Sequence, residues 1–389
     1  MIARNILLLV LIIILPDIYL YLHYVRRGVK KQWWKKLLWW IPCLAMVAFA
    51  AYLAMGNGFL PKGLPIVETF LLLFSIIVLP KAIYALCSVL GLIVCRLTRS
   101  SRNWGNLVGL FFAVYAIYVA LAGSLWGFKE LTVRHVELAF SDLPKSFDGY
   151  KIALFSDAHV GTMYGNRQSM LATVVDSLNA QGADMIAFLG DLQNIEPQEV
   201  YPHRTALSLL EAKDGVYSVL GNHDYSFYSD VSPAESVANE KELQSMQRQF
   251  GWLLLMNEHK TIHCGKDSIV IVGLENGGKN RFPRKDDIEK ATNGVAKEAF
   301  MIVLEHDPTL WQTDILPKTN AQLTLSGHTH GGQVALFGWR PTRLLYRQND
   351  GLHTEGNRSI YVTSGVGGLI PFRYGVPAEI VVITLRRNA

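Results

Sequence analysis

The chain has 389 residues, and half of them are hydrophobic, which is a high proportion for a protein surrounded by water. Residues 1–127 contain 12 Lys and Arg but only two acidic residues, which leaves 25 basic and 30 acidic residues in the remainder. The second part is therefore mildly acidic and lacks the basic surface expected of a nucleic-acid-binding domain. Four cysteines, three of them in apolar runs, imply neither a disulfide framework nor a cysteine-based metal site.

Four apolar runs of membrane-spanning length occupy the first part, at about residues 6–24, 37–55, 67–95 and 107–126. Because roughly 20 apolar residues cross a bilayer, these runs predict four transmembrane helices. Pro16 and Asp17 interrupt the first run. We interpret it as a kinked helix whose acid faces other helices; a functional acid is the alternative. A signal peptide is disfavoured because no small-residue cleavage site follows. Pro80-Lys81 predicts a kink in the third run, and a span followed by an interfacial piece is the alternative.

The loops between these runs differ in charge. The first loop carries six Lys and Arg between residues 26 and 36, and the third carries three between residues 96 and 102. The second loop carries only Lys62, and the N-terminus only Arg4. Short basic loops remain in the cytoplasm, so four spans place both termini outside it. We therefore predict a multi-pass integral membrane protein whose second part is extracytoplasmic. A different number of spans would reverse this orientation.

Residues 128–150 are predicted to form a linker and a first strand, and residues 151–389 a separate domain. Residues 131–138 alternate as an edge strand does, with His135 as a surface residue. Helices are expected at 168–181 and 204–212, and Asp307-Pro308 is a good helix start. The polar insert 225–257 predicts a helix at 234–250, either solvated or acting as a lid. Further strands are expected at 321–325, 333–337, 359–363 and 379–385.

Five predicted strands each end in residues of the types that bind metals. In α/β folds, ligands bind beyond the carboxyl ends of the strands. Imidazole is the commonest neutral metal ligand near neutral pH. The side chains at these strand ends are Asp157 and His159, Asp191, Asn222 with His223 and Asp224, His306, and His328 with His330. The pattern predicts a metal centre.

These motifs, in this order, resemble the calcineurin-like metallophosphoesterase family, and residues 360–380 resemble its YkuE-type branch, which includes membrane-anchored members. The resemblance covers about residues 132–385 and implies an α/β/β/α sandwich of two mixed sheets. It also implies two divalent ions, Mn, Fe or Zn. Asp191 would bridge the ions. The first site would add Asp157, His159 and His330, and the second Asn222, His306 and His328. Many relatives have an Asp where this chain has Asn194.

Two divalent ions about 3.5–4 Å apart acidify a water and neutralise charge on phosphoryl oxygens. The family pattern makes His223 the general acid or a donor to the phosphoryl group, with Asp224 orienting its ring. Candidates for phosphate or headgroup contacts, each alternatively a partner in a surface salt bridge, are Arg281, Arg284, Arg340 and Arg373. The apolar stretches 336–339 and 344–346 either rest on the bilayer or belong to the core.

We therefore predict a membrane-anchored dinuclear-metal phosphohydrolase that cleaves a phosphoester or pyrophosphate bond. The membrane tether favours a lipid or lipid-linked substrate, with the bilayer as the other partner and no nucleic acid. One alternative is a nuclease or nucleotide phosphodiesterase with the same metals. Another is a non-catalytic membrane scaffold, although every ligand position is retained.

Overall fold

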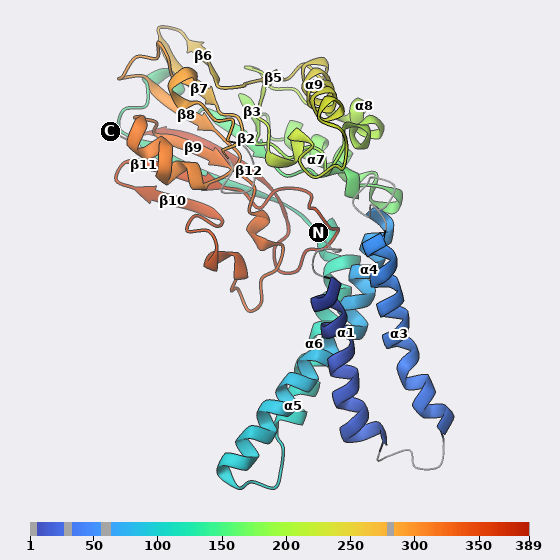
Figure 1. Cartoon of the computed structure of the whole chain (residues 1–389). Helices are drawn as coiled ribbons and strands as arrows, with labels where there is room; N and C mark the ends of the chain where they lie inside the picture. The colour runs from blue at the N-terminus through green and yellow to red at the C-terminus, as the bar shows by residue number, and fades with distance from the viewer. Residues whose placement is uncertain (1–5, 27–32, 56–63, 278–283, 389) are drawn as a thin grey trace. The chain divides into compact units, whose positions relative to one another are not determined.

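The structure, a computed structural model, describes residues 6–26, 33–55, 64–277 and 284–388, which form two compact units (Figure 1). The units are Met1–Leu125 and Trp126–Ala389. The sequence-based division after residue 127 lies beside this boundary.

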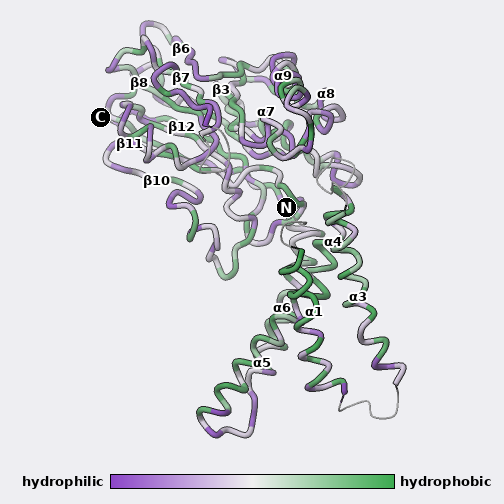
Figure 2. The backbone as a smooth tube through the Cα atoms, viewed as in Figure 1, coloured by the Kyte–Doolittle hydropathy of each residue, from purple (hydrophilic) through white to green (hydrophobic). Residues whose placement is uncertain are grey.

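The first unit contains four helical segments long and apolar enough to cross a membrane, as the sequence predicted: Ile6–Val25, Trp33–Met55, Leu64–Thr98 and Gly105–Lys129. Figure 2 shows hydrophobic residues along most of them. Their helices are α1 (Ile6–Leu20), α3 (Trp33–Met55), α4 (Leu64–Leu73), α5 (Leu79–Thr98) and α6 (Gly105–Leu125). A π-helical turn, Phe74–Val78, joins α4 to α5 just before Pro80. Proline cannot donate a helix hydrogen bond, and such turns commonly accommodate that loss.

Asp17 of α1 is buried and forms an ion pair with Lys81 of α5, with Nζ 2.8 Å from Oδ1. The Lys81 ammonium also lies over the ring of Trp39 in α3, 5.2 Å from its centroid. The acid therefore faces other helices, as we interpreted it from the sequence. Pairing is the usual way in which a membrane helix tolerates a charged side chain.

The second unit contains two mixed six-stranded sheets. The first has the order β1-β12-β2-β3-β4-β5 and the second β10-β11-β9-β8-β7-β6. The first sheet consists of β1 (Leu131–Phe140), β12 (Ala378–Arg387), β2 (Lys151–Phe155), β3 (Met185–Phe188), β4 (Val216–Ser218) and β5 (Leu253–Leu254). The second consists of β10 (Gly351–Glu355), β11 (Arg358–Val362), β9 (Leu323–Ser326), β8 (Phe300–Leu304), β7 (Asp267–Gly273) and β6 (Glu258–Cys264).

The sheets pack face to face, because one buried apolar cluster draws residues such as Ile152 and Ile383 from the first and Ile302 and Leu323 from the second. Helices α7 (Met170–Asn179) and α9 (Pro233–Gln249) contribute to a cluster on the outer face of the first sheet. A third cluster joins the outer face of the second sheet to the helical segment around Trp311. These layers form the α/β/β/α sandwich that the resemblance implied.

Most sequence-based elements occur near their expected positions. Asp307 Oδ1 accepts a hydrogen bond from Thr309 N at 3.0 Å and so caps the start of the third expected helix. The helix expected at 204–212 is only the short α8 (Arg204–Leu207). His135 is exposed on edge strand β1, as expected. In α9, Leu243 and Met246 are buried in the core, so this helix is not a wholly solvated one.

The strand expected at 333–337 was wrong. This stretch makes only isolated bridges, from Val334 to Tyr374 and from Leu336 to Trp339. Gly331, Gly332 and Gln333 adopt positive φ angles of 54°, 77° and 56°, which turn the chain out of the extended conformation that a strand requires. β10, fifteen or so residues later, pairs with β11 at the edge of the sheet instead.

Candidate metal centre

The predicted metal ligands follow the ends of five strands that come from both sheets. Asp157 and His159 follow β2, Asp191 follows β3, and Asn222 follows β4. From the second sheet, His306 follows β8, and His328 and His330 follow β9. β2, β3 and β4 are mutually parallel, as are β8 and β9, so the turns after them lie at one edge of each sheet.

Tight backbone turns aim these side chains. Ten described non-glycine residues have a positive φ angle, and five of them are predicted ligands: Asp157, His159, Asp191, His328 and His330. Such conformations are unfavourable for residues with a Cβ and cluster at functional sites, where the surrounding fold compels them. Backbone strain therefore falls on five of the seven predicted metal ligands.

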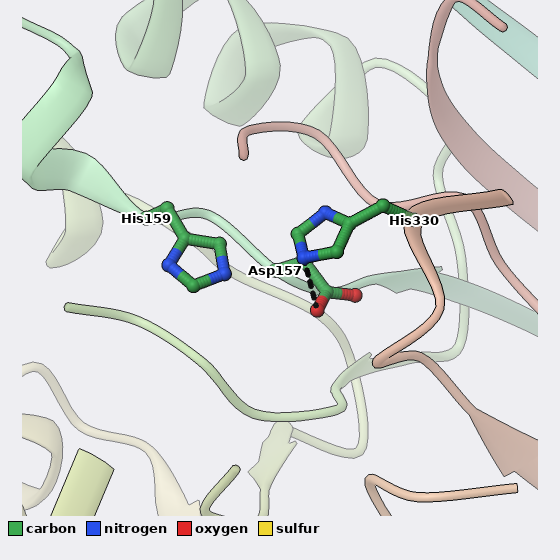
Figure 3. A group of neighbouring side chains, drawn as sticks. All are labelled: Asp157, His159 and His330. Atoms are coloured by element: carbon green, nitrogen blue, oxygen red, sulfur yellow. Dashed lines mark ion pairs between the residues drawn. The ribbon is translucent and has the colours of Figure 1, made fainter. Parts of the chain in front are cut away.

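The ligand atoms converge in three overlapping groups whose members lie within 4.8 Å of one another. The groups are Asp157 with His159 and His330, His159 with Asp191 and His223, and Asp191 with His306 and His328. In Figure 3 the carboxylate of Asp157 lies beside the ring of His330, with Oδ1 3.4 Å from Nε2, and His159 stands opposite.

Asp191 occupies the position that a shared ligand needs. Its Oδ2 lies 3.1 Å from Nε2 of His306 and 3.5 Å from Nε2 of His159. His306 Nδ1 lies 2.7 Å from the carbonyl of Leu189 and must donate to it, so Nε2 is the nitrogen left to face Asp191. Nδ1 of His328 lies 3.3 Å from that Nε2. One carboxylate thus touches imidazoles from both predicted metal sites.

The site's buried polar atoms fit bound cations. Among the described residues, no hydrogen-bond partner is found for several buried atoms of the site: Asp157 Oδ1, both ring nitrogens of His159, Asn222 Oδ1 and His330 Nδ1. Leaving buried polar atoms unpaired is costly, and a metal ion would compensate. Asn222 Nδ2 donates to Tyr228 Oη at 2.8 Å, which leaves its oxygen available.

The protonation states also suit metal binding. Burial lowers the pKa of His159 well below its usual value and that of His330 to about 4, so both rings are neutral. Burial by itself would raise the pKa of Asp191. The nearby His306 and His223 oppose this effect and outweigh it, so the pKa of Asp191 is lowered. The neutral rings of His159 and His330 and the ionised carboxylate of Asp191 supply nitrogen and oxygen donors of the kinds that divalent transition metals take.

The ring of His223 is oriented by the main chain of Asn194 and not, as we expected, by Asp224. Its Nδ1 lies 2.5 Å from the carbonyl oxygen of Asn194 and therefore donates to it, and Tyr228 stacks on the ring with centroids 3.9 Å apart. Asp224 instead accepts hydrogen bonds from the backbone N–H groups of Gly221, Asp191 and Leu192, at 2.9, 2.8 and 2.9 Å. Asp224 thus holds two ligand-bearing turns together and does not orient the His223 ring.

The departure at Asn194 has a simple structural consequence. Its main-chain carbonyl makes the contact with His223, and a main-chain group is present whatever the side chain is. The backbone N–H of Asn194 donates to the buried carboxylate of Glu199, with N 2.5 Å from Oε2. The contact to His223 is therefore retained despite the change from Asp to Asn.

Three of the four arginines predicted as phosphate contacts bind carboxylates or main-chain carbonyls of the protein itself. The fourth, Arg281, lies outside the described residues. Arg284 forms ion pairs with Asp286 and Asp314, and Arg340 pairs with Asp350 at 2.8 Å. Arg373 is completely buried and donates to main-chain carbonyls. These acceptors are Ser364, Gly365, Gly367, Val376 and Pro377. Arg373 is therefore a structural residue behind the site and does not face a substrate.

Sequence reasoning missed the two tyrosines at the site. Tyr228 stacks on His223, and Tyr346 Oη lies 3.0 Å from Nε2 of His328. This contact fixes the ring of a predicted ligand whose Nδ1 faces the other ligands. Neither tyrosine belongs to a local motif, so no signal in the sequence distinguishes it from other loop tyrosines.

Residues 3–128 match the family model described as "Probable Calcineurin-like phosphoesterase, transmembrane domain", and residues 150–332 match "Calcineurin-like phosphoesterase". The "Uncharacterized metallophosphoesterase YkuE" of Bacillus subtilis (strain 168) is 29% identical over 300 residues, covering 72% of this chain and 96% of the relative. The "Transmembrane protein with metallophosphoesterase domain" of Danio rerio is 28% identical over 288 residues, covering 71% of this chain and 61% of the relative. An "Uncharacterized metallophosphoesterase" of Helicobacter pylori (strain J99 / ATCC 700824) is 29% identical, and 70% of each chain is covered.

Proposed function

Because this chain belongs to the calcineurin-like phosphoesterase family and carries that family's four-helix transmembrane domain, we propose that it is a membrane-anchored dinuclear-metal phosphohydrolase. Its substrate would be a lipid or lipid-linked molecule, cleaved at a phosphoester or pyrophosphate bond. The observation that supports this most is the position of Asp191, whose carboxylate lies within 3.5 Å of imidazoles from both ligand groups.

The two ligand groups define where the ions would bind. Asp157, His159 and His330 would hold one ion, and Asn222, His306 and His328 the other, with Asp191 serving both. Divalent ions held by these residues would neutralise charge on phosphoryl oxygens and lower the pKa of water. Asn222 contributes an amide oxygen, which adds a ligand without reducing the positive charge of the centre.

His223 is placed to move a proton. Its Nδ1 proton is engaged by the Asn194 carbonyl, so Nε2 is the nitrogen that can exchange a proton with a substrate. One ring nitrogen of His223 lies within 4.8 Å of ligand atoms of His159 and Asp191. Tyr228 packs against one face of the ring and limits its rotation. We therefore assign to His223 the protonation of the leaving-group oxygen, for which Nε2 must first take up a proton from water, because burial lowers the pKa of this ring.

The membrane attachment supports a substrate that also resides in the bilayer. The fourth candidate span ends at Lys129, and β1 begins at Leu131, so very little chain separates membrane and domain. A nuclease would need a basic groove, whereas residues 128–389 contain more acidic than basic residues. A non-catalytic scaffold would have no need for strained, buried ligands. The loop charges support an extracytoplasmic position for the domain.

Metal analysis and a substrate panel test the proposal on the full-length protein in detergent. We expect two divalent ions per chain and turnover of lipid phosphoesters or pyrophosphates in mixed micelles. Asp191→Ala should lose both ions and all turnover, whereas Asp176→Ala, which removes an exposed carboxylate of α7, should change neither. Normal metal content and turnover in Asp191→Ala would show that the site is misassigned. Turnover of oligonucleotides or nucleotides, with no turnover of any lipid in the panel, would reject the lipid substrate.

A further inference from the structure

We propose that residues 336–345, here called the apolar loop, dock on the surface of the lipid bilayer and hold the metal centre against it. Large apolar side chains project from this loop: Phe337 is 85% exposed, Leu344 77% and Leu345 74%. Among the described residues of the second unit, these are the three most exposed large hydrophobic side chains. Trp339, at 47%, lies between them in the chain. Such a cluster on a folded domain marks an interaction surface.

The charge around the apolar loop suits a lipid surface. Residues 331–349 contain Arg340, Arg343 and Arg347 and no acidic residue, although the domain as a whole is acidic. Arg340 forms an ion pair with Asp350, with Nη1 2.8 Å from Oδ2. Arg343 Nη2 lies 3.9 Å from the other oxygen of the same carboxylate, and 55% of the Arg343 side chain is exposed. Apolar side chains beside exposed arginines bind an interface of acyl chains and anionic headgroups.

The sheet register places the metal centre at the edge where the chain enters the second unit. Leu131, the first residue of β1, pairs with Ala378, the first residue of β12. β12 runs antiparallel to β2, so it begins at the edge where β2 ends and leads into Asp157. β1 and β2 are separated by β12 alone, a distance of roughly 10 Å across two strand spacings.

The link between this edge of the second unit and the last membrane helix is short. The five residues 126–130 join the last helix of the first unit to β1, and a chain of that length reaches at most about 18 Å. A lipid surface consequently lies within reach of the edge that carries the metal ligands.

The base of the apolar loop packs against the metal-ligand turn. A Cβ on Gly331 would lie 2.4 Å from Nη1 of Arg340, and one on Gly332 would lie 2.8 Å from the side chain of Thr342. Just after the loop, Tyr346 contacts the ring of His328. Contact of the loop tips with lipid would therefore steady the turn that carries two ligands. Docking itself does not depend on the proposed activity.

Lipid quenching in proteoliposomes tests the docking directly. The full-length protein, with its four native cysteines replaced, would carry an environment-sensitive fluorophore at Phe337→Cys. The matched control is Leu209→Cys, 60% exposed and located shortly before β4, on the opposite edge of the sheet from the ligands. Vesicles would contain phosphatidylcholine and phosphatidylglycerol, with nitroxide-labelled lipids as quenchers.

We expect quenching at position 337 to exceed that at 209 by about tenfold, since interfacial side chains insert roughly 5–10 Å into the headgroup and acyl boundary. The double substitution Leu344→Asp and Leu345→Asp should abolish this quenching while the metal content stays normal. Equal quenching at 337 and 209 would overturn the proposal. So would protection of position 337 from aqueous quenchers without lipid quenching, because that result indicates a protein partner or a second copy.

An activity measurement separates docking from the proposed function. If both hold, the double substitution should reduce turnover of vesicle-embedded substrate at least about tenfold, in line with the loss of interfacial binding, and spare a soluble chromogenic ester. Lipid quenching without any lipid turnover would support docking and reject the lipid substrate. Lipid turnover by the wild type without quenching at position 337 would support the function and reject docking.

Discussion

Replacing Arg373 with Met distinguishes the two roles that this residue was given. The sequence offered it as a phosphate contact, whereas the structure places it behind the site, fully buried among main-chain carbonyls. Burial lowers the pKa of its guanidinium to about 10, so it remains cationic at neutral pH. A structural role predicts loss of stability and of bound metal. A substrate contact predicts a raised KM with stability unchanged.

The magnitude follows from the carbonyls that lose a donor. The carbonyl of Gly365 still accepts a hydrogen bond from Glu379 N, and the carbonyl of Pro377 still accepts one from Ser364 Oγ. In the described residues, the carbonyls of Ser364, Gly367 and Val376 keep none. Each buried unsatisfied group costs about 1–3 kcal/mol, and relief of the buried charge offsets part of the sum. We expect a loss of about 3–5 kcal/mol, or roughly 6–10 °C in melting temperature for a domain of this size.

Thermal unfolding of the full-length protein in detergent, followed by tryptophan fluorescence, measures this loss, and metal analysis accompanies it. Arg386→Met is the matched control, because both partners of its ion pair with Glu137 are exposed and such pairs contribute little to stability. Arg373→Lys retains the charge but replaces a planar fork of five donors with a single nitrogen, so it should rescue little. An Arg373→Met protein with normal melting temperature and metal content, and a raised KM, would refute the structural role.

Two further predictions follow from contacts in the structure, and a third follows from the charges of the loops. His223→Ala should lower turnover roughly 10²–10⁴-fold with metal content intact. Asn194→Ala should have a much smaller effect, because its main-chain carbonyl makes the contact; similar losses in steady-state assays would contradict this assignment. Asp17→Asn and Lys81→Met should each cost about 3–5 kcal/mol of thermal stability in detergent, and the double variant should recover most of it. Single variants as stable as the wild type would show that the pair contributes nothing. Alkaline phosphatase fused after Ala389 should be active, and a fluorescent protein that matures only in the cytoplasm should stay dark; the reverse would place the domain in the cytoplasm.

The sequence by itself determined the features that depend on short stretches of chain. Hydropathy over about 20 residues sufficed to predict four membrane helices, because burying apolar surface in lipid depends on composition more than on contacts. The ligand candidates were also visible, because each stands in a tight turn directly after an apolar strand. The candidates Asp157 and Asp191 lie close together because they follow neighbouring parallel strands of one sheet, and His306 joins Asp191 because the second sheet packs against the first.

Only the tertiary structure decided which partner each polar side chain takes. The partners of Arg373 lie within nine residues of it, yet the sequence does not show that its whole side chain is buried. Asp17 meets Lys81 across 64 positions, and Tyr346 meets His328 across 18. Such contacts depend on the order of strands and the packing of helices. Local propensity contains no information on strand order or helix packing. The incorrect prediction of a strand at 333–337 shows that turns with positive φ angles can override an apolar pattern.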